Sequence, residues 1–281
     1  MTGVHDKSAT VTRHTTKTRV LGLAEENLNL NVTLEGKIII ITGAARGIGA
    51  AIARQAATNG AEGLVMVDRA PITGDVECPT ECVTADLAEP TAPETITAAA
   101  IARFGRIDGL VNAAGLTTRA SFTDAQTSLW DQLMAVNARA PFFLMAGAIK
   151  DMTRRKAPGS IVNIQSMNAH CGAPDLAIYA STKGALQTTT KNAANAHLSD
   201  RIRVNGINLG WIDTDTERKL HDIDLAKGVG WLAREGARLP LGRHLSVDEA
   251  ARLTVYLLSD VSTPMTGVSI DLEQAVLGAL I

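Results

Sequence analysis

Short apolar runs alternate with longer, alanine-rich segments from about residue 35 to the end of the chain. The apolar runs have the length and uniformity of strands that are buried on both faces, and they span 37–41, 63–68, 109–112, 160–166, 203–209 and 268–271. Segments with helical spacing of apolar residues predict helices over 48–58, 93–104, 127–150 and 176–198. Strands that alternate with helices form a parallel sheet with right-handed crossovers. The pattern therefore predicts a single doubly wound α/β domain with helices on both faces of its sheet.

The first 33 residues lack this pattern. They are rich in Thr, Asn, Lys and Arg and show no sustained apolar periodicity. We predict a largely irregular extension over 1–33, partly ordered near 20–23, followed by the α/β domain over 34–281. An arm that docks on a neighbouring subunit is the alternative interpretation of this segment.

Composition narrows the classes of protein that remain. The 281 residues carry 27 Lys+Arg and 29 Asp+Glu, and the formal charge of −2 argues against a nucleic-acid-binding surface. The longest purely aliphatic run, 38–41, is far shorter than the ~20 residues of a membrane span, and 20–23 is too short for a signal-peptide core. Three cysteines without a regular framework are typical of a reducing compartment, so we expect a cytoplasmic protein.

A glycine-rich loop follows the first predicted strand and opens the first predicted helix. It reads TGAARGIG over residues 42–49. Glycine lets the backbone turn tightly and approach a pyrophosphate, while the helix N-terminus offers free N–H groups and a partial positive charge. The order of strand, loop and helix therefore predicts a dinucleotide site of the Rossmann type. We assign to it Gly43, Arg46, Gly47, Ile48 and Gly49.

Asp68 ends the second predicted strand and bears on the choice of cofactor. A carboxylate there can accept hydrogen bonds from both adenine-ribose hydroxyls and would repel a 2′-phosphate, which favours NAD over NADP. Arg46 and Arg69 are nearby cations that could accommodate that phosphate. NADP therefore remains the alternative cofactor.

Two further motifs follow in the chain, NAAG at 112–115 and YASTK at 179–183. Together with TGAARGIG, in this order and on these predicted elements, they resemble the short-chain dehydrogenase/reductase family. The resemblance extends from about residue 35 to the C-terminus. It implies a Rossmann-type fold and an NAD- or NADP-dependent oxidoreductase that interconverts a secondary alcohol and a ketone.

The resemblance also implies roles for individual residues. Beyond the glycine loop and Asp68, the residues that it assigns to the cofactor are Asp86, Leu87, Asn112, Ala113, Gly115, Tyr179, Lys183, Ile212 and Thr214. The residues that it assigns to catalysis are Asn137, Ser166, Tyr179 and Lys183.

The chemistry of the catalytic set is consistent with these residue types. Tyr179 and Lys183 are four residues apart, so they share one face of a helix. An ammonium beside a phenol favours the phenolate and would lower the pKa of Tyr179 towards the working pH, as a general base requires. Ser166 would hold and polarise the substrate oxygen, and Asn137 would anchor a water that links Lys183 to solvent. The hydride transfer itself belongs to the nicotinamide.

The chain departs from the family pattern after the sixth strand. The family carries Pro-Gly there, whereas this chain has Leu209-Gly210, and the loss of proline removes a restraint on φ. The detailed geometry of this loop therefore stays open. The charged segment that follows, about 213–239, resembles the mobile lid that the family places over its substrate. A solvated pair of helices is the alternative.

Polar residues beyond Ser166 suggest the kind of substrate. We expect Asn168, His170 and Cys171 to line the pocket, with Trp211 opposite. Such a polar set favours a hydroxylated substrate such as a sugar or polyol.

Two other features admit more than one interpretation. Cys78 and Cys82 invite a metal site, but no second Cys/His pair has the spacing of a tetrahedral site, so we expect a plain loop and no metal. The apolar residues 276–281 would be a liability if exposed. We expect their burial at a subunit interface, in a homotetramer of the kind common in this family.

We therefore predict an NAD-dependent oxidoreductase with a small-molecule alcohol or ketone substrate and no nucleic-acid or membrane partner. One alternative is an NADP-dependent reductase of β-keto-acyl substrates, which Asp68 disfavours. The other is a catalytically silent NAD-binding regulator. A pure sensor has no need of the set formed by Asn137, Ser166, Tyr179 and Lys183.

Overall fold

In the computed structural model, which describes residues 32–276, seven strands form one sheet in the order β3-β2-β1-β4-β5-β6-β7. All neighbouring strands are parallel. The strands are β1 Ile38–Thr42, β2 Gly63–Asp68, β3 Thr80–Thr84, β4 Gly109–Asn112, β5 Gly159–Ser166, β6 Ile202–Leu209 and β7 Ser269–Leu272. The strand order reverses between β1 and β4, which is the switch point where doubly wound sheets bind ligands at the carboxyl ends of their strands. The predicted fold class is confirmed.

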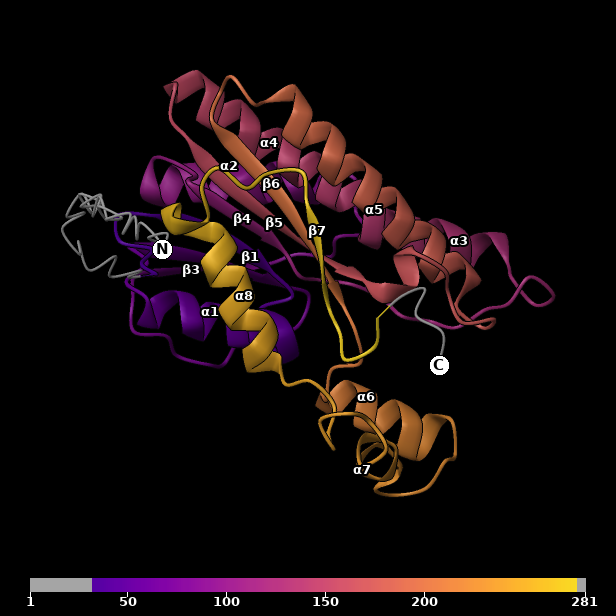
Figure 1. The fold of residues 1–281 in the computed structure, drawn as a ribbon. Coiled ribbons are helices and arrows are strands. Elements are labelled where there is room, and N and C mark those ends of the chain that lie inside the picture. Colours follow the sequence, from indigo (N-terminus) through magenta and orange to yellow (C-terminus); the bar gives the residue numbers. More distant parts are fainter. Residues whose placement is uncertain (1–31, 277–281) are drawn as a thin grey trace, which may run out of the picture. The chain divides into compact units, whose positions relative to one another are not determined.

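Helices cover both faces of the sheet (Figure 1). One face carries α1 (Gly47–Thr58) and α8 (Val247–Leu258), which pack on each other. The opposite face carries α2 (Ala92–Phe104), α4 (Ala140–Arg155) and α5 (Ala177–Ala196). Each face thus has its own hydrophobic core.

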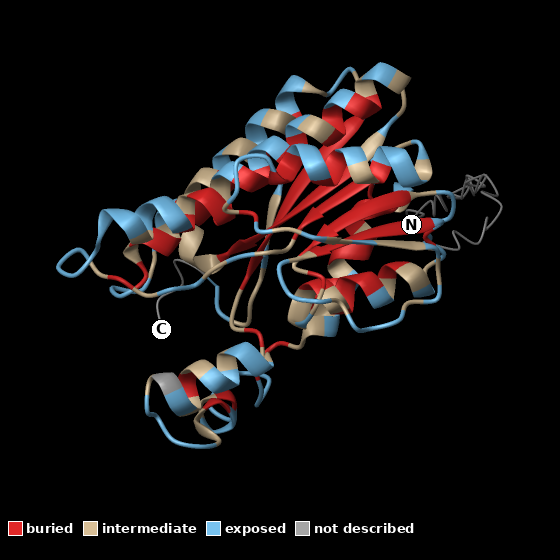
Figure 2. Ribbon diagram, turned by 180° about the vertical axis from the view of Figure 1, so that it is seen from behind, coloured by how far each residue is buried: buried red, intermediate tan, exposed pale blue. Residues whose placement is uncertain are grey.

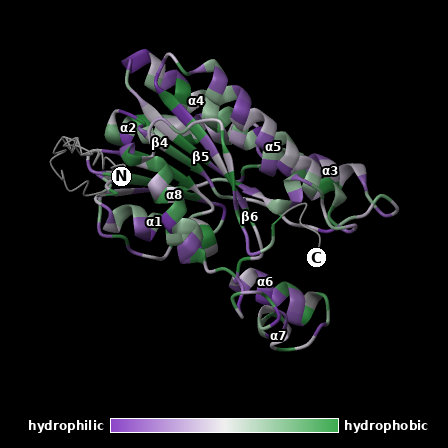
Figure 3. Ribbon diagram, viewed as in Figure 1, coloured by the Kyte–Doolittle hydropathy of each residue, from purple (hydrophilic) through white to green (hydrophobic). Residues whose placement is uncertain are grey.

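The strands are uniformly apolar because both of their faces are buried. Along β1, Ile39 and Ile41 belong to the core under α1 and α8, whereas Ile40 belongs to the opposite core. Successive strand residues point to opposite faces of a sheet, so both sets of positions must be apolar here. Figure 2 shows the central strands as buried, and Figure 3 shows that their residues are hydrophobic.

The strand β3 is missing from the apolar runs predicted above. It pairs with β2 at the edge of the sheet, and its residues are only partly buried or exposed. An edge strand of this kind carries polar residues, so the search for uniformly apolar runs passes over it. Cys82 therefore lies in a strand, which corrects the loop predicted around Cys78 and Cys82. Among residues 32–276, no group of three or more His, Cys, Asp or Glu side chains could hold a metal ion.

The long helix predicted over 127–150 is three segments. They are α3 (Thr127–Met134), a π-helical turn (Ala135–Arg139) and α4, which continues to Arg155. π-helical turns inside α-helices are frequent at functional sites. The turn here contains Asn137, one of the predicted catalytic residues.

The helix α8 begins with a capping motif, which a search for apolar periodicity does not detect. Ser246 accepts a hydrogen bond from the Glu249 N–H at 3.3 Å, and the Glu249 carboxylate accepts one from the Ser246 N–H at 2.8 Å. This reciprocal capping box satisfies two amides at the helix start. The Arg243 guanidinium, together with the Ser246 amide, lowers the pKa of Glu249 to about 2.

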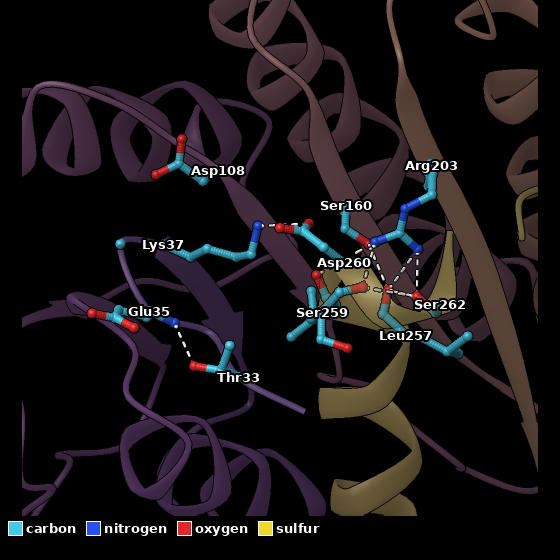
Figure 4. Close-up of polar contacts among 12 residues, drawn as sticks. Thr33, Glu35, Lys37, Asp108, Ser160, Arg203, Leu257, Ser259, Asp260 and Ser262 are labelled. Carbon is cyan, nitrogen blue, oxygen red and sulfur yellow. Dashed lines mark hydrogen bonds and ion pairs between the residues drawn. The ribbon is translucent and has the colours of Figure 1, made fainter. Parts of the chain in front are cut away.

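A buried arginine fastens the other end of α8 to the sheet (Figure 4). Arg203 of β6 donates to the carbonyl oxygens of Leu257 and Ser259, both at 2.9 Å, and to Ser262 Oγ at 2.7 Å. The last carbonyls of a helix have no partner within the helix, and a cation is favourable at this end. Arg203 therefore supplies the C-terminal cap of α8, although burial lowers its pKa.

The segment between β6 and α8 contains only short elements. They are α6 (Asp215–Lys219), a π-helical turn (Leu220–Asp224) and α7 (Trp231–Gly236). Figure 1 shows α6 and α7 beyond the carboxyl ends of the strands. The lid that the resemblance implies for 213–239 stays a prediction.

Several predicted features lie outside the described residues. They include the extension over 1–31, with its partial order near 20–23, and the apolar terminus from 277 onwards. Val276, the one described residue of that terminus, is 78% exposed. Within residues 32–276, no helix is long and apolar enough to cross a membrane.

Candidate active site

The glycine loop lies against the end of β4, and close contacts require its glycines. Gly43 has a φ of +72°, and a Cβ there would lie 2.9 Å from Ala114 Cα. A Cβ on Gly49 would lie 2.1 Å from the carbonyl oxygen of Gly43. Real Cβ atoms do not come this close to backbone, so only glycine fits at either position.

The start of α1 forms one wall of a groove of about 280 Å³. Its N-cap residue, Arg46, has an extended backbone and makes no side-chain capping bond. The first amides of a helix have no intrahelical partner, so they remain available to an anion. Gly43, Arg46, Gly47, Ile48 and Gly49 all line this groove, and this cradle fits a pyrophosphate.

Acidic residues from β2 and from the loop after β3 line the same groove. Asp68 accepts hydrogen bonds from the Ala45 and Ala70 amides, both at 3.0 Å. Its carboxylate is therefore held at the end of β2 by the glycine loop itself. Asp86 and Leu87 also line the groove, as does Arg69.

The turn after β4 is held by Thr42. Its Oγ1 accepts hydrogen bonds from the Ala113 amide at 3.1 Å and the Ala114 amide at 3.2 Å. Ala113 and Gly115 line the groove. Asn112 lies behind them, where its buried amide donates to Asn163 Oδ1 at 2.8 Å. The structure thus places Asn112 in the sheet rather than on the groove wall.

Tyr179 and Lys183 lie on the buried face of α5. Lys183 Nζ lies 5.8 Å from the centre of the Tyr179 ring and donates to the carbonyl oxygen of Ile164 at 2.8 Å. Burial lowers the pKa of Lys183 to about 8. The helical spacing thus brings the two side chains together as predicted.

The pKa of Tyr179 shifts in the opposite direction to the one predicted. It is raised to about 12, mainly because burial disfavours the phenolate, and the Glu217 carboxylate raises it further. The Ser166 side chain lowers the pKa of Tyr179, but its effect is smaller than that of burial. The sequence shows the neighbouring lysine and not the depth of burial, which is the stronger effect here.

Ser166 ends β5 and has a defined hydrogen-bonding role. Its Oγ accepts from the Asn168 backbone amide at 3.1 Å and from Asn168 Nδ2 at 3.2 Å. A hydroxyl has one proton to donate and two lone pairs. With Asn168 donating to both lone pairs, Ser166 is left to donate its own proton, and it donates towards the Tyr179 side chain, whose pKa it lowers.

Asn137 is fully buried in the π-helical turn. Its Oδ1 accepts from the Leu116 amide and its Nδ2 donates to the Leu116 carbonyl, both at 2.8 Å. Nδ2 also lies 3.1 Å from Thr182 Oγ1 on α5. Asn137 therefore ties the chain after β4 to the helix that carries Tyr179.

A second cavity, of about 640 Å³, adjoins the groove. Ser166, Tyr179 and Lys183 line it, and so does Ile212. The residues that line both spaces are Ile48, Ala113, Gly115, Thr117, Thr214 and Glu217. A nucleotide in the groove would therefore border the cavity that holds the tyrosine.

Comparisons with known proteins agree with this architecture. A family model described as enoyl-(acyl carrier protein) reductase matches residues 43–273. Short chain dehydrogenase adrF of Penicillium rubens is 31% identical over 249 residues, which covers 86% of this chain and 97% of that protein. L-xylulose reductase of Bos taurus is 32% identical over 248 residues, which covers 87% and 98% respectively. The chain belongs to the short-chain dehydrogenase/reductase family.

A solved member of the family has the same fold. The structure of L-sorbose reductase from Gluconobacter frateurii, complexed with NADPH and L-sorbose, matches with a TM-score of 0.81 and 28% identity, over 89% of this chain and 100% of that chain. As a short-chain dehydrogenase/reductase, the protein is an NAD(P)-dependent oxidoreductase of the alcohol and ketone class.

Leu209, which stands where the family carries proline, takes a regular place in the sheet. It pairs with Ser166 of β5 and Leu272 of β7, and the following Gly210 amide donates to the Leu272 carbonyl at 2.9 Å. Leu209 thus ends β6 as a paired residue, and the Gly210 hydrogen bond anchors the start of the loop. Thr214 caps α6 by accepting from the Glu217 amide at 3.1 Å.

Two residues expected in the pocket of this short-chain dehydrogenase/reductase lie elsewhere. Asn168 and Trp211 line the cavity, but His170 and Cys171 do not. A 3-10 turn at Met167–Ala169 redirects the chain, and His170 Nε2 instead lies 3.1 Å from Asp271 Oδ1 of β7.

Several cavity residues escaped the sequence analysis. They are the charged or ionisable residues Arg119, Asp175, Glu217, His221, Lys227 and Glu273. They come from segments far apart in the chain, so no single motif contains them. The sequence offers a signal for three of them only: Glu217, His221 and Lys227 belong to the charged segment after β6.

Proposed function

We propose that this short-chain dehydrogenase/reductase uses NAD to interconvert a secondary alcohol and a ketone, with a sugar or polyol as substrate. The observation that carries the proposal is the convergence of Ser166, Tyr179 and Lys183 on a cavity that shares a wall with the nucleotide groove. A proton acceptor and a hydride acceptor must reach the same carbinol together. Two adjoining spaces with these side chains meet that requirement.

The proton is assigned to Tyr179. When the alcohol is oxidised, Tyr179 must first lose its proton, and the alcohol O–H proton then passes to the Tyr179 phenolate while the C–H hydrogen leaves as a hydride and the C=O bond forms. NAD, when bound, supplies the hydride acceptor. In the reverse direction Tyr179 donates its proton to the carbonyl oxygen. A pKa of about 12 makes Tyr179 a protonated acid at neutral pH, which suits the reductive direction.

Lys183 and Ser166 assist this transfer. With a pKa of about 8, Lys183 is largely an ammonium at neutral pH and favours the phenolate of Tyr179. One ammonium N–H is held by the Ile164 carbonyl, so the others are available to a nicotinamide ribose. The proton of Ser166 would polarise the substrate oxygen.

We further propose that Asn137 and Lys183 hold a water between them. A Cβ built on Gly115 would lie 3.5 Å from Asn137 Oδ1 and 3.6 Å from Lys183 Nζ, so both polar atoms face the same point. Oδ1 has a second lone pair beyond the one that the Leu116 amide uses. A water there would link Lys183 to solvent, so that a proton from solvent can reach the Lys183 amine.

Asp68 supports NAD. Its carboxylate is fixed by two amides at the end of β2, on the wall of the groove. A 2′-phosphate would bring a second anion against it. Arg46 and Arg69 line the same groove and favour NADP, and the Gluconobacter frateurii enzyme was solved with NADPH. Because the glycine loop holds the Asp68 carboxylate in place, its repulsion of a 2′-phosphate outweighs the attraction of the two arginines, which favours NAD.

A hydroxylated substrate is supported by the cavity's polar walls. Asn168, Glu217 and His221 line it beside Ser166. Relatives named for L-xylulose and L-sorbose are reductases of sugars. Two alternatives remain, a β-keto-acyl reductase and a silent NAD-binding regulator. The match to a model described as enoyl-(acyl carrier protein) reductase favours the first, and Asp68 weighs against it.

The protein's assembly and compartment are also proposals. Phe142 and Phe143 on α4 are 48% and 52% exposed, which is unusual for large apolar side chains and supports association into a homotetramer. All three cysteines are free, as expected in the cytoplasm. Light scattering that gives a monomer would contradict the tetramer.

The decisive test is a substrate screen with sugars, polyols and hydroxy acids, each with NAD and with NADP, followed by absorbance of the reduced nicotinamide. We expect turnover of a neutral polyhydroxylated compound with NAD. Turnover confined to β-keto-acyl thioesters with NADPH would support the first alternative. Nucleotide binding without turnover of any compound would support the regulator.

A further inference from the structure

Glu217 occupies the junction between the nucleotide groove and the substrate cavity, and it lines both. Its Oε2 accepts a hydrogen bond from Trp211 Nε1 at 3.3 Å and lies 3.4 Å from His221 Nε2. The Glu217 carboxylate also raises the pKa of Tyr179. Glu217 and Tyr179 line the same cavity, so the carboxylate faces the space in which the substrate oxygen would bind.

His221 lines the same cavity, and the hydrogen-bonding capacity of its ring nitrogens is not fully used. It is 2% exposed, its Nε2 has only the 3.4 Å approach to Glu217 Oε2, and its Nδ1 has no hydrogen-bond partner among the described residues. Burial lowers the pKa of His221, so the imidazole is neutral, with one N–H donor and one acceptor nitrogen. Buried polar atoms are almost always paired in folded proteins. An incompletely paired imidazole in a cavity wall indicates a ligand that completes it.

Aromatic packing holds His221 in place, and the Trp211 indole N–H holds Glu217. The His221 ring stacks on Trp231 with 4.5 Å between centres and 17° between planes. Trp211 contacts both rings and also meets His244, at 4.7 Å between centres. Side chains fixed in this way can present a carboxylate and an imidazole without first losing rotational freedom.

We propose that Glu217 and His221 are specificity-determining residues that bind a second hydroxyl of the substrate, on the carbon next to the reacting one. The substrate class is then an uncharged vicinal diol and its α-hydroxy ketone. The inference rests on the function proposed above. The hydroxyl donates to the Glu217 carboxylate, and the imidazole N–H donates to the hydroxyl oxygen.

The charge of Glu217 disfavours hydroxy acids as substrates. A hydroxy acid would place its own carboxylate against Glu217, and like charges at this distance repel. Of the cations that line the cavity, Lys183 lies beside Tyr179 at the reacting centre, Arg119 Nη1 lies 2.5 Å from Asp175 Oδ2, and Lys227 Nζ lies 3.9 Å from the centre of the Trp231 ring. Glu217 therefore selects a neutral donor.

The test measures kcat/KM for three ketones that differ only beside the carbonyl. Acetoin carries the adjacent hydroxyl, 2-butanone lacks it, and 2-oxobutanoate lacks it too but has a carboxylate in place of the methyl group on the carbonyl carbon. We expect the wild-type protein to prefer acetoin over 2-butanone by about ten- to a hundred-fold, as for a hydrogen bond to a charged group. Glu217→Gln should reduce that preference at least about tenfold and raise the relative rate on 2-oxobutanoate.

Glu235→Gln is the matched control. Glu235 is a carboxylate of the same segment, on α7, but it pairs with Arg238 at 2.7 Å and does not line the cavity. This variant should keep the wild-type ratios. A merely structural role of Glu217 would lower kcat/KM on all three ketones in parallel and leave the ratios unchanged.

His221→Asn supplies an independent second variant, which should lower the acetoin preference by less than Glu217→Gln does. The inference is overturned if wild type shows no preference for acetoin, if it reduces none of the three ketones, or if Glu217→Gln keeps the wild-type ratio. The proposed function fails separately, if the wider screen finds no alcohol or ketone that is turned over.

Discussion

The nucleotide groove and the substrate cavity share a wall, yet they are built in different ways. At the glycine loop the groove is walled by backbone, where glycines permit close approach and the first amides of α1 lack intrahelical partners. The cavity is made of side chains that five or more distant segments contribute, including the short elements after β6. Backbone geometry repeats from protein to protein, whereas a side-chain set is particular to one chain. The groove therefore identifies the family, and the cavity carries the individual specificity.

The substitution Tyr179→Phe distinguishes most clearly between the role of the cavity in turnover and the role of the groove in nucleotide binding. It removes the proton donor and acceptor but keeps the ring that packs in the cavity. We expect kcat to fall by about 10³- to 10⁴-fold, the upper range for general acid–base catalysis, while nucleotide binding stays within about twofold. Stopped-time assays and the fluorescence of bound reduced nicotinamide measure the two quantities. Turnover near the wild-type rate would remove Tyr179 from the mechanism.

The reverse experiment damages the groove and spares the cavity. In Gly49→Ala, the new Cβ would lie 2.1 Å from the Gly43 carbonyl oxygen, so the glycine loop must shift. We expect nucleotide affinity to fall about a hundredfold, because the loop amides lose their alignment. Gly74→Ala is the matched control, since nothing lies within 4 Å of its Cβ.

Gly74→Ala should bind nucleotide as wild type does. Kd values from titration, with melting temperatures recorded beside them, separate a displaced loop from a destabilised fold. Equal affinity of the Gly49→Ala variant and wild type would show that the loop does not hold the nucleotide.

The cavity also differs from the groove in carrying a buried ionisable group that opposes stability. The pKa of Lys183 falls from 10.5 to about 8 in the folded protein. Between these values the unfolded chain holds more protons than the folded one, so the free energy of unfolding rises with pH. Below about pH 8 both states carry the ammonium, and the destabilisation by burial is fully present.

Lys183→Met removes this contribution. We expect wild type to gain about 1–3 kcal/mol relative to the variant between pH 8 and pH 10. Denaturant unfolding of both proteins across that range gives the difference. Parallel pH profiles would show that Lys183 titrates normally, and they would remove the argument that burial governs the site.

The contrast between the regions also explains what the sequence could predict. TGAARGIG identifies the groove because its glycines, strand and helix are contiguous in the chain. Tyr179 and Lys183 were predictable as a pair because helical spacing fixes their relation. Glu217 and His221 were not, since they lie on a five-residue helix and a π-helical turn without periodic pattern.

Burial was the other quantity that the sequence could not supply. Lys183 beside Tyr179 predicts a lowered tyrosine pKa, but the desolvation that raises it depends on every element packed around α5. The edge strand β3 was missed for a related reason, because partial burial gives it no apolar run. His170 was misplaced because a single 3-10 turn redirects the chain.

A smaller effect tests the cofactor choice within the groove. Asp68→Asn keeps the shape of the side chain and removes its charge, so a 2′-phosphate no longer meets an anion, while Arg46 and Arg69 still line the groove. We expect the ratio of kcat/KM with NAD to that with NADP to fall about tenfold, mostly through a gain with NADP. Asp86→Asn is the matched control, because Asp86 lines the same groove and lies on the loop after β3. If wild type already prefers NADP, or if the ratio is the same in Asp68→Asn and wild type, the two arginines and not Asp68 decide the cofactor.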